Sequence, residues 1–505
     1  MIKKNLTSSI ILVMMLLITP CVSAQTYRQI KGWSKEVNDR LEDFLNSTIT
    51  MKIRKVAVFD GDGTVMGQVP HYLADEALYQ YADEHFKGKT DKFSKEKMAI
   101  LNRMVKDGNN VGKPYVEDRV HFLAGLTPEE ILDGCQVVIH EDQILRIQPE
   151  GSPVEGEIDE QINGYGGWLI PGFVDIHSDY VEQMIAPRVT SVIDFELALY
   201  EYEKELMAHG ITTMFHSISL LKNTGKKAMR RPENVRRLME LIDRSHNQLH
   251  LIHHRFHLRF ELDNIDAYED VLDFIDKGYV HLLSFMDHTP GQGQYRNLEI
   301  YKLSYIADEG LSEAQVEEEL RRRMHHETLT LDKIQAAADK AFEKGIAIAS
   351  HDDDTIEKLD VVQDFHATIS EFPITMEVCA EAHRRSMATV VGAPNILLGG
   401  SHAGNLTASE AIEAGIADIL CSDYYPASIL HAIFMMEHQG QTLPKMVRMA
   451  TLNPAKAVGI EDRVGSIEVG KKADLLIVQE LPNHFPAITH VLVDGVVVSE
   501  THYRI

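Results

Sequence analysis

Short apolar runs alternate with amphipathic helical patterns between residues 171 and 449, and this alternation limits the possible folds more than any other feature. The clearest helical pattern runs from Ile193 to His209, and Gly210 follows it as a helix C-cap. Strands are predicted for the apolar runs Trp168–Val174, Ile211–Phe215, Leu249–Leu262, His281–Met286, Ile346–Ser350, Ile396–Gly399 and Ala417–Cys421. Repeated strand–helix units of this kind predict a (β/α)8 barrel of the α/β class.

Strand-rich segments flank the predicted barrel on both sides. Residues 137–147 alternate around a polar turn, as a β-hairpin does, and residues 464–498 form short apolar runs separated by Gly turns. We therefore expect a small β-sandwich built from both ends of this region. Residues 133–170 would form its first part and residues 450–505 its second.

The first predicted barrel strand ends in two polar side chains, His177 and Asp179. Because alternate residues of a strand face the same side, these side chains are predicted to point together at the carboxyl end of the strand. That end carries the chemistry in barrel enzymes. A core strand has little use for two adjacent inward polar groups unless something binds them. The alternative is a strand that simply ends in a polar loop.

Polar residues recur at the ends of the other predicted strands. They are His216, His257, Arg259, Glu261, Asp287, His288, His351 to Asp354, Ser422 and Asp423. Any one of them is more often an ordinary core or loop residue than a ligand. Together they supply enough histidines and carboxylates for one or two divalent ions of the zinc, manganese or iron type.

Several longer motifs follow one another in a specific order. They lie at residues 171–179, 257–261, 286–292, 349–353, 399–405, 421–426, 453–455 and 469–475. Through these motifs, residues 133–505 resemble the amidohydrolase superfamily and, more narrowly, its phosphonate-metabolism branch. The His-x-Asp pair at His177 and Asp179 departs from the His-x-His usual in the wider superfamily, but resembles the narrower branch.

The resemblance implies a metal site and a reaction. The implied metal-site residues are His177, Asp179, Glu261, His288, His351 and Asp423. Glu261 would bridge two metals, and Asp423 would be the catalytic general base that takes the proton of a metal-bound water. The implied substrate is the small molecule alpha-D-ribose 1-methylphosphonate 5-triphosphate. Attack of metal-bound hydroxide on its α-phosphorus would give the 5-phosphate and diphosphate without a covalent intermediate.

A triphosphate needs cationic or N–H partners. The predicted substrate-binding residues are Arg188, Arg259, Gln292, Gly400, Ser401, His402 and Asn405. The turn at residues 399–405 can expose backbone N–H groups as an anion nest, with a flexible turn as the alternative. The arginines can add bidentate phosphate contacts, unless Arg259 pairs with Glu261 or an Asp. Gln292 lies in a Gly-rich loop that can reach the ribose.

Two other functions stay open at this point. The same barrel and ligands suit an amidohydrolase that acts on a C–N bond, such as an N-acyl or cyclic amide. The predicted phosphate-binding residues are the feature that distinguishes a triphosphate hydrolase from such an amidohydrolase. An inactive barrel that serves as a binding protein is the third function, and failure to retain metal after purification would favour it.

The first 132 residues differ in character from the rest. Residues 1–24 are typical of a secretory signal, with an early Lys pair, an uncharged apolar run and a small-x-small cleavage site. Residues 25–132 resemble a fragment of a haloacid dehalogenase-like phosphatase, whose hhhhDxDGT motif matches residues 55–64. Asp60 would be the phosphoryl acceptor and Asp62 an acid/base, and both can share Mg²⁺. Because the later motifs of that family are missing, we interpret this segment as a vestigial phosphatase.

Composition limits the partners of the chain. Its net charge of -26 argues against nonspecific nucleic-acid binding. No segment is typical of a stable membrane span. The predicted signal indicates export to the periplasm or beyond, whereas a ribosyl triphosphate implies the cytoplasm, and the sequence leaves this conflict open. Enzymes of the phosphonate pathway and a homo-oligomer are compatible with the resemblance.

Overall fold

The computed structural model describes residues 12–15, 56–59, 87, 92–107, 134–154, 156–188, 191–222, 228–245, 250–291, 293, 298–299, 302, 306, 312–400 and 405–503. The chain divides into two compact units, residues 1–136 with 149–151, and residues 137–148 with 152–505. Among the residues described, every helix is too short or too polar to span a bilayer.

The first unit contains a small strand pair and a helix. β1 (Leu12–Met15) pairs antiparallel with β2 (Val56–Phe59), and α3 (Lys92–Asp107) is amphipathic. β1 lies inside the predicted signal, whose removal and the resulting export stay predictions. Asp60 and Asp62 lie outside the described residues, so the phosphatase site and its Mg²⁺ also stay predictions.

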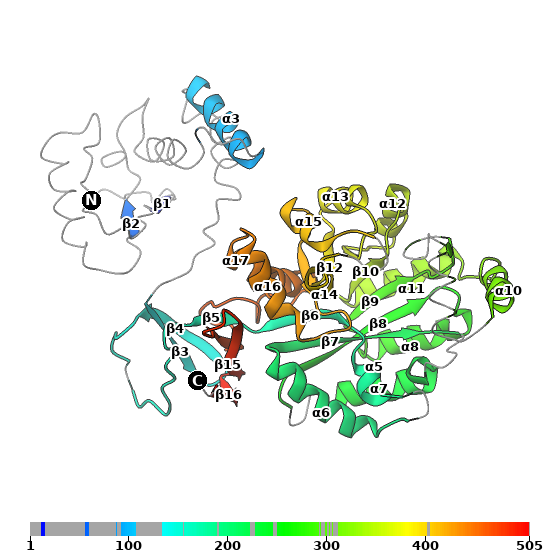
Figure 1. The fold of residues 1–505 in the computed structure, drawn as a ribbon, viewed down its shortest axis with the longest axis horizontal. Coiled ribbons are helices and arrows are strands. Elements are labelled where there is room, and N and C mark those ends of the chain that lie inside the picture. Colours follow the sequence, from blue (N-terminus) through cyan, green and yellow to red (C-terminus); the bar gives the residue numbers. More distant parts are fainter. Residues whose placement is uncertain are drawn as a thin grey trace, which may run out of the picture. The chain divides into compact units, whose positions relative to one another are not determined.

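The second unit is built on eight parallel strands that form one sheet in sequence order (Figure 1). They are β6 (Phe173–Ser178), β7 (Ile211–Leu220), β8 (His253–Glu261), β9 (Leu282–Met286), β10 (Ala347–His351), β11 (Ile369–Glu371), β12 (Ala388–Gly392) and β13 (Ile419–Cys421). A parallel bridge between Ser178 and Asp423 links the two ends of the sheet. The predicted (β/α)8 barrel is therefore confirmed.

Helices connect the strands and cover their outer face (Figure 1). They are α5 (Val181–Ile185), α6 (Phe195–Ala208), α7 (Pro232–Ser245), α8 (Tyr268–Asp276), α10 (Glu313–Arg323), α11 (Leu331–Glu343), α12 (Ile356–Asp364), α13 (Met376–Arg384), α14 (Ala393–Leu397), α15 (Ala408–Glu413), α16 (Ser428–His438), α17 (Leu443–Met449) and α18 (Leu452–Ala457), with 3-10 turns at Ala228–Arg230 and Ile265–Ala267. The first long helix begins at Phe195 because the Asp194 carboxylate accepts the N–H groups of Glu196 and Leu197.

Parts of the strand assignment were wrong. The apolar run Ile396–Gly399 is not a strand, because α14 occupies most of it and Pro394 favours a helix start. β12 lies earlier in the chain, and β11 was not predicted. Periodicity alone cannot assign such short apolar runs. His216 does not follow the second strand but lies inside it, since β7 continues to Leu220.

Strands from both ends of the second unit form the flanking β-structure. The hairpin β3 (Cys135–His140) and β4 (Gln143–Pro149) lies beside an antiparallel sheet in the order β16-β15-β14-β5. This sheet comprises β5 (Trp168–Pro171), β14 (Leu475–Glu480), β15 (Pro486–Val493) and β16 (Val496–Glu500). Ile144 of the hairpin and Leu475 of the sheet share one small core. The predicted construction from both ends is confirmed.

An apolar plug fills the amino-terminal half of the barrel. It includes Val174, Ile176, Phe215, Leu282, Ile369, Val390 and Ile419. Inward side chains nearer the carboxyl ends of the same strands are polar, among them Ser217, Ser284 and Glu371, and they are fully buried. The fold thus gathers buried polar groups at one end of the barrel, where barrel enzymes place their chemistry.

Candidate active site

The first barrel strand carries a local irregularity that turns His177 inward. The pairing of β6 with β7 shifts register between Asp175 and Ser178. Ile176 packs in the apolar plug, while the His177 ring contacts the rings of His257 and His351. Two consecutive side chains therefore face the interior, which strict alternation does not predict. The bulge brings the predicted residue to the site.

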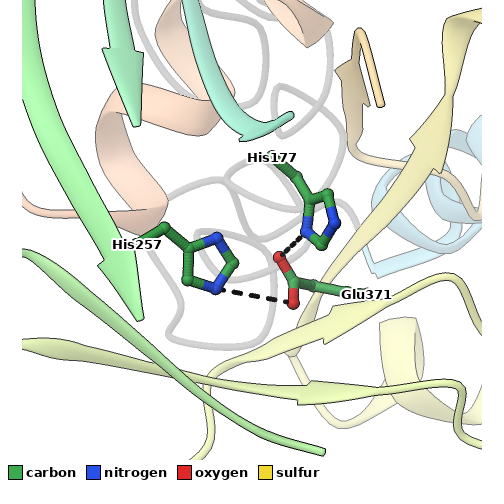
Figure 2. Close-up of side chains that lie close together, drawn as sticks. All are labelled: His177, His257 and Glu371. Carbon is green, nitrogen blue, oxygen red and sulfur yellow. Dashed lines mark hydrogen bonds and ion pairs between the residues drawn. The ribbon is translucent and has the colours of Figure 1, made fainter. Parts of the chain in front are cut away.

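The side chains of His177, His257 and Glu371 converge from three strands to form what we call the His177–Glu371 cluster (Figure 2). His177 Nδ1 lies 2.8 Å from Glu371 Oε1, and Ser284 Oγ donates to Glu371 Oε2 at 2.8 Å. His257 Nε2 lies 3.9 Å from Glu371 Oε2. Glu371 was absent from the predicted site because it ends β11, a strand too short to be recognised. Its only signal was an acidic residue two positions after Ile369.

A second group, the His288–His351 cluster, consists of His288, His351 and Asp352. His351 Nδ1 lies 3.1 Å from Asp352 Oδ2. His288 Nδ1 lies 2.7 Å from an oxygen of Glu261, and its Nε2 lies 3.9 Å from Asp352. The ring centroids of His177 and His351 are 5.4 Å apart, so the two clusters adjoin. Three of the predicted metal-site residues thus meet here.

Asp179 is held by arginines. Arg230 Nη2 donates to Asp179 Oδ2 at 3.1 Å, and Arg230 Nε donates to Glu182 at 2.7 Å. Arg259 Nη1 lies 4.0 Å from the same Asp179 oxygen. Arg230, which lies ahead of α7, was not among the predicted residues. Its position outside any strand end gave no signal in the sequence.

Asp423 lies two residues after the end of β13, among other acidic groups. Its backbone N–H donates to the His177 carbonyl at 3.0 Å, which fixes it beside β6. Its φ of 56° is a left-handed conformation that Asp tolerates. Burial, followed by the charge of Asp179, raises the pKa of Asp423 to about 7. A carboxyl group with a pKa near neutrality is suited to proton transfer.

Arg259 lies among buried histidines of the site. Its Nη2 lies 3.4 Å from His351 Nε2, and the side chain is buried. Burial, followed by the positive charge of Arg259, holds the pKa of His177 and the pKa of His351 well below their usual range. Both rings are therefore neutral near pH 7, which is the form that binds metals. The sequence also allowed Arg259 to pair with an Asp. Asp179 Oδ2 lies 4.0 Å from Arg259 Nη1, at the limit of ion-pairing distance.

Comparison with known proteins places this geometry in a family. Residues 168–498 match the model of the amidohydrolase family. The chain belongs to the amidohydrolase family. It is similar to the alpha-D-ribose 1-methylphosphonate 5-triphosphate diphosphatase of Escherichia coli (strain K12), with 34% identity over 351 residues, which are 68% of this chain and 90% of that protein. The imidazolonepropionase of Fusobacterium nucleatum subsp. nucleatum matches locally, with 41% identity over 76 residues, which are 14% of this chain and 18% of that protein.

Solved structures agree with the amidohydrolase fold. A Xaa-Pro dipeptidase with bound methionine aligns with a TM-score of 0.50 and 14% identity, over 74% of this chain and 97% of that one. Molinate hydrolase aligns with the same TM-score and identity, over 74% of this chain and 92% of that one. At such low identity these likenesses concern the fold alone.

The residues of both clusters fit a divalent metal, the usual cofactor of this family. His257 Nδ1 lies 3.0 Å from the Ile176 carbonyl, to which a neutral ring can donate, while its Nε2 lies 2.5 Å from Ser284 Oγ and 3.9 Å from Glu371 Oε2. Metal-binding histidines are commonly oriented by such a second hydrogen bond. In the other cluster, His351 Nδ1 and Asp352 Oδ2 are buried and face each other without a hydrogen bond. Buried polar atoms of that kind call for a cation.

The predicted substrate-binding residues have varied placements. Arg188 is exposed, and its backbone forms an isolated antiparallel β-bridge with Ser191. The Gly400 N–H donates to the Asn395 carbonyl at 3.0 Å, so it closes the end of α14 and is not available to an anion. Asn405 is partly buried. Gln292, Ser401 and His402 lie outside the described residues, and the anion nest stays a prediction.

Proposed function

We propose that this amidohydrolase splits alpha-D-ribose 1-methylphosphonate 5-triphosphate into the 5-phosphate and diphosphate during phosphonate breakdown. The observation that carries the proposal is the match with the diphosphatase of that name, which spans 90% of that relative. The buried site at the carboxyl end of the barrel, with its adjoining clusters and arginines, supports a reaction on an anionic substrate.

We assign one or two divalent ions of the zinc, manganese or iron type to the two clusters. The His177–Glu371 cluster would hold one ion, and the His288–His351 cluster, with Glu261 beside it, would hold the other. Bound there, such ions would activate water and neutralise phosphoryl charge. Asp179 lies nearest to arginines, so its predicted role as a ligand competes with its ion pair to Arg230.

Asp423 is the group that we assign to proton transfer. With a pKa of about 7, it is ionised in a large fraction of molecules near neutral pH and can accept the proton of the attacking water. The water oxygen bonds to the α-phosphorus, the bond from that phosphorus to the bridging oxygen breaks, and diphosphate leaves. Arg259, which is buried beside His351, would contact phosphoryl oxygens.

The test is an assay of the purified chain with the ribosyl triphosphate, in which both products are followed by phosphorus NMR. We expect Asp423→Asn to lower kcat by about 10²–10⁴-fold with little change in KM. Asp462→Asn, which removes the same charge from an exposed position, is the matched control and should retain full activity. Removal of divalent ions with a chelator should abolish activity, and their return should restore it. Undiminished diphosphate release by Asp423→Asn would contradict the assignment of the base.

Hydrolysis of a C–N bond is the second candidate, and the local match with imidazolonepropionase is the observation that favours it. That match covers 14% of the chain, against 68% for the diphosphatase. An N-acyl amino acid and a cyclic amide should therefore be turned over far more slowly than the ribosyl triphosphate. Faster turnover of either amide would reverse the order of the two candidates.

A further inference from the structure

A cavity of about 420 Å³ lies at the amino-terminal end of the barrel strands, opposite the candidate active site. It is lined by the beginning of β8, the turns before β9 and β10, and the loop after α18. Phe215 and Val458 supply apolar surface and belong to the plug that fills the barrel. The volume lies in the range of about 300–1,000 Å³ that is typical of small-molecule sites.

The wall of this cavity carries surplus positive charge. Arg255, Lys344 and Arg463 line it, and within the described part of the chain none of them forms an ion pair with a carboxylate. The acidic residue of the lining, Asp276, is paired with Lys340 at 2.7 Å. The chain as a whole has a net charge of -26, so acidic residues are plentiful elsewhere. The cluster of cations is therefore a local feature that the overall charge does not explain.

Arg255 and Arg463 line the same cavity, so their positive charges repel each other. Burial, followed by the charge of Arg463, lowers the pKa of Arg255 to about 10. A cation at a partly buried position beside a second cation costs free energy unless a counterion lies near it. The carboxyl-terminal ends of α8 and α11 border the cavity and add partial negative charge, but Lys277 and Lys344 stand at those ends and offset it. The two guanidinium groups remain uncompensated.

His281 lines the same wall as a neutral ring. Its Nδ1 accepts the Phe256 N–H at 3.1 Å, so the proton of the neutral ring is on Nε2. Burial, followed by the charge of Arg255, holds the pKa of His281 at about 3. Among the described residues, the charged donors of the wall that carry no ion pair thus include the two guanidinium forks of Arg255 and Arg463. This is a set of donors that suits phosphoryl oxygens.

We propose that this cavity binds a phosphoryl anion, held chiefly by the guanidinium groups of Arg255 and Arg463, with diphosphate as a tight small ligand. The proposal does not depend on the proposed catalytic function. It places an anion site at the end of the barrel that usually contributes stability alone. A bound anion would remove the repulsion between the two arginines and would stabilise the barrel from this end.

The test is calorimetric titration of the full chain with diphosphate in the presence of a chelator, which removes divalent ions from the opposite end of the barrel. We expect one saturable site, weaker binding at higher salt, and a higher thermal unfolding midpoint with ligand. Inorganic phosphate, with less charge, should bind more weakly. Arg255→Gln and Arg463→Gln should each weaken binding about tenfold or more.

Two control variants separate this site from other anion binding. Arg321→Gln removes one charge from the exposed face of α10, where the side chain pairs with Glu318, and should leave the affinity unchanged. Arg259→Gln, in the candidate active site, should also leave it unchanged. Because Arg463 is exposed, its replacement keeps the test open even where Arg255→Gln fails to fold. Loss of binding in Arg259→Gln but not in Arg463→Gln, or the absence of saturable binding, would overturn the proposal.

Discussion

At the scale of single residues, Glu371 is the most constrained group of the site. Its side chain is fully buried, and its two oxygens contact His177 and Ser284. Because His177 is neutral near pH 7, these contacts satisfy hydrogen bonds but do not cancel the negative charge. A buried carboxylate without a compensating cation is costly. This residue is therefore the one whose charge most clearly calls for a metal.

We predict that Glu371→Gln binds metal at least about tenfold more weakly than the unchanged chain, because an amide keeps the shape of the side chain but removes its charge. The chelated protein should unfold near its usual midpoint, since Ser284 can still donate to the amide oxygen. The measurement is metal content after dialysis, with calorimetry of unfolding. Glu377→Gln, on the exposed start of α13, is the control. An unchanged metal content in Glu371→Gln would contradict the assignment.

At the scale of secondary structure, the sequence predicted strands that end in recognisable polar residues. β6, β8, β9 and β10 were found in this way, and so were His177, Glu261, His288 and His351. β11 was missed because three residues are too few to show periodicity, and Glu371 was missed with it. The inward turn of His177 depends on a register shift, which only the pairing with β7 creates. Local patterns predicted the elements, whereas the contacts between distant strands completed the site.

The pairing of β8 with β9 leads to a prediction about pH. The backbone N–H of His281 donates to the Phe256 carbonyl at 2.9 Å, and the backbone N–H of Phe256 donates to Nδ1 of the His281 ring. Burial lowers the pKa of His281 from 6.5 to about 3. Below pH 6.5 the unfolded chain therefore binds a proton that the folded chain does not, so stability falls as the pH decreases. The loss should reach about 2 kcal/mol at pH 5.

His281→Gln should remove this contribution, so that its free energy of unfolding changes by about 2 kcal/mol less between pH 7 and pH 5. The amide oxygen can still accept the Phe256 N–H, which keeps the strand contact. His502→Gln, at an exposed position near the carboxyl end, is the control and should follow the unchanged chain. Urea titrations at the two pH values measure the difference. Parallel pH profiles for His281→Gln and the unchanged chain would rule out this origin.

At the scale of the whole molecule, the flanking β-structure joins strands that precede the barrel in the sequence to strands that follow it. β5 precedes the barrel, yet it pairs with β14, which follows it. Ile144, from the hairpin before β5, packs with Ala473 and Leu475. The family match covers residues 168–498 and so begins after the hairpin. The physical unit therefore includes residues that the family pattern omits.

This closure predicts how two shortened chains will behave. A chain that begins at residue 134 keeps the hairpin and β5, so we expect it to unfold at the same midpoint and to retain full hydrolytic activity. A chain that begins at residue 172 lacks β5, one of the two strands that pair with β14, so β14 becomes an open sheet edge and Leu475 is exposed. Open apolar edges promote association. We therefore expect this shorter chain to aggregate and to unfold at a lower temperature. Equal solubility and equal midpoints for the two chains, measured by light scattering and calorimetry, would show that the flanking β-structure is dispensable.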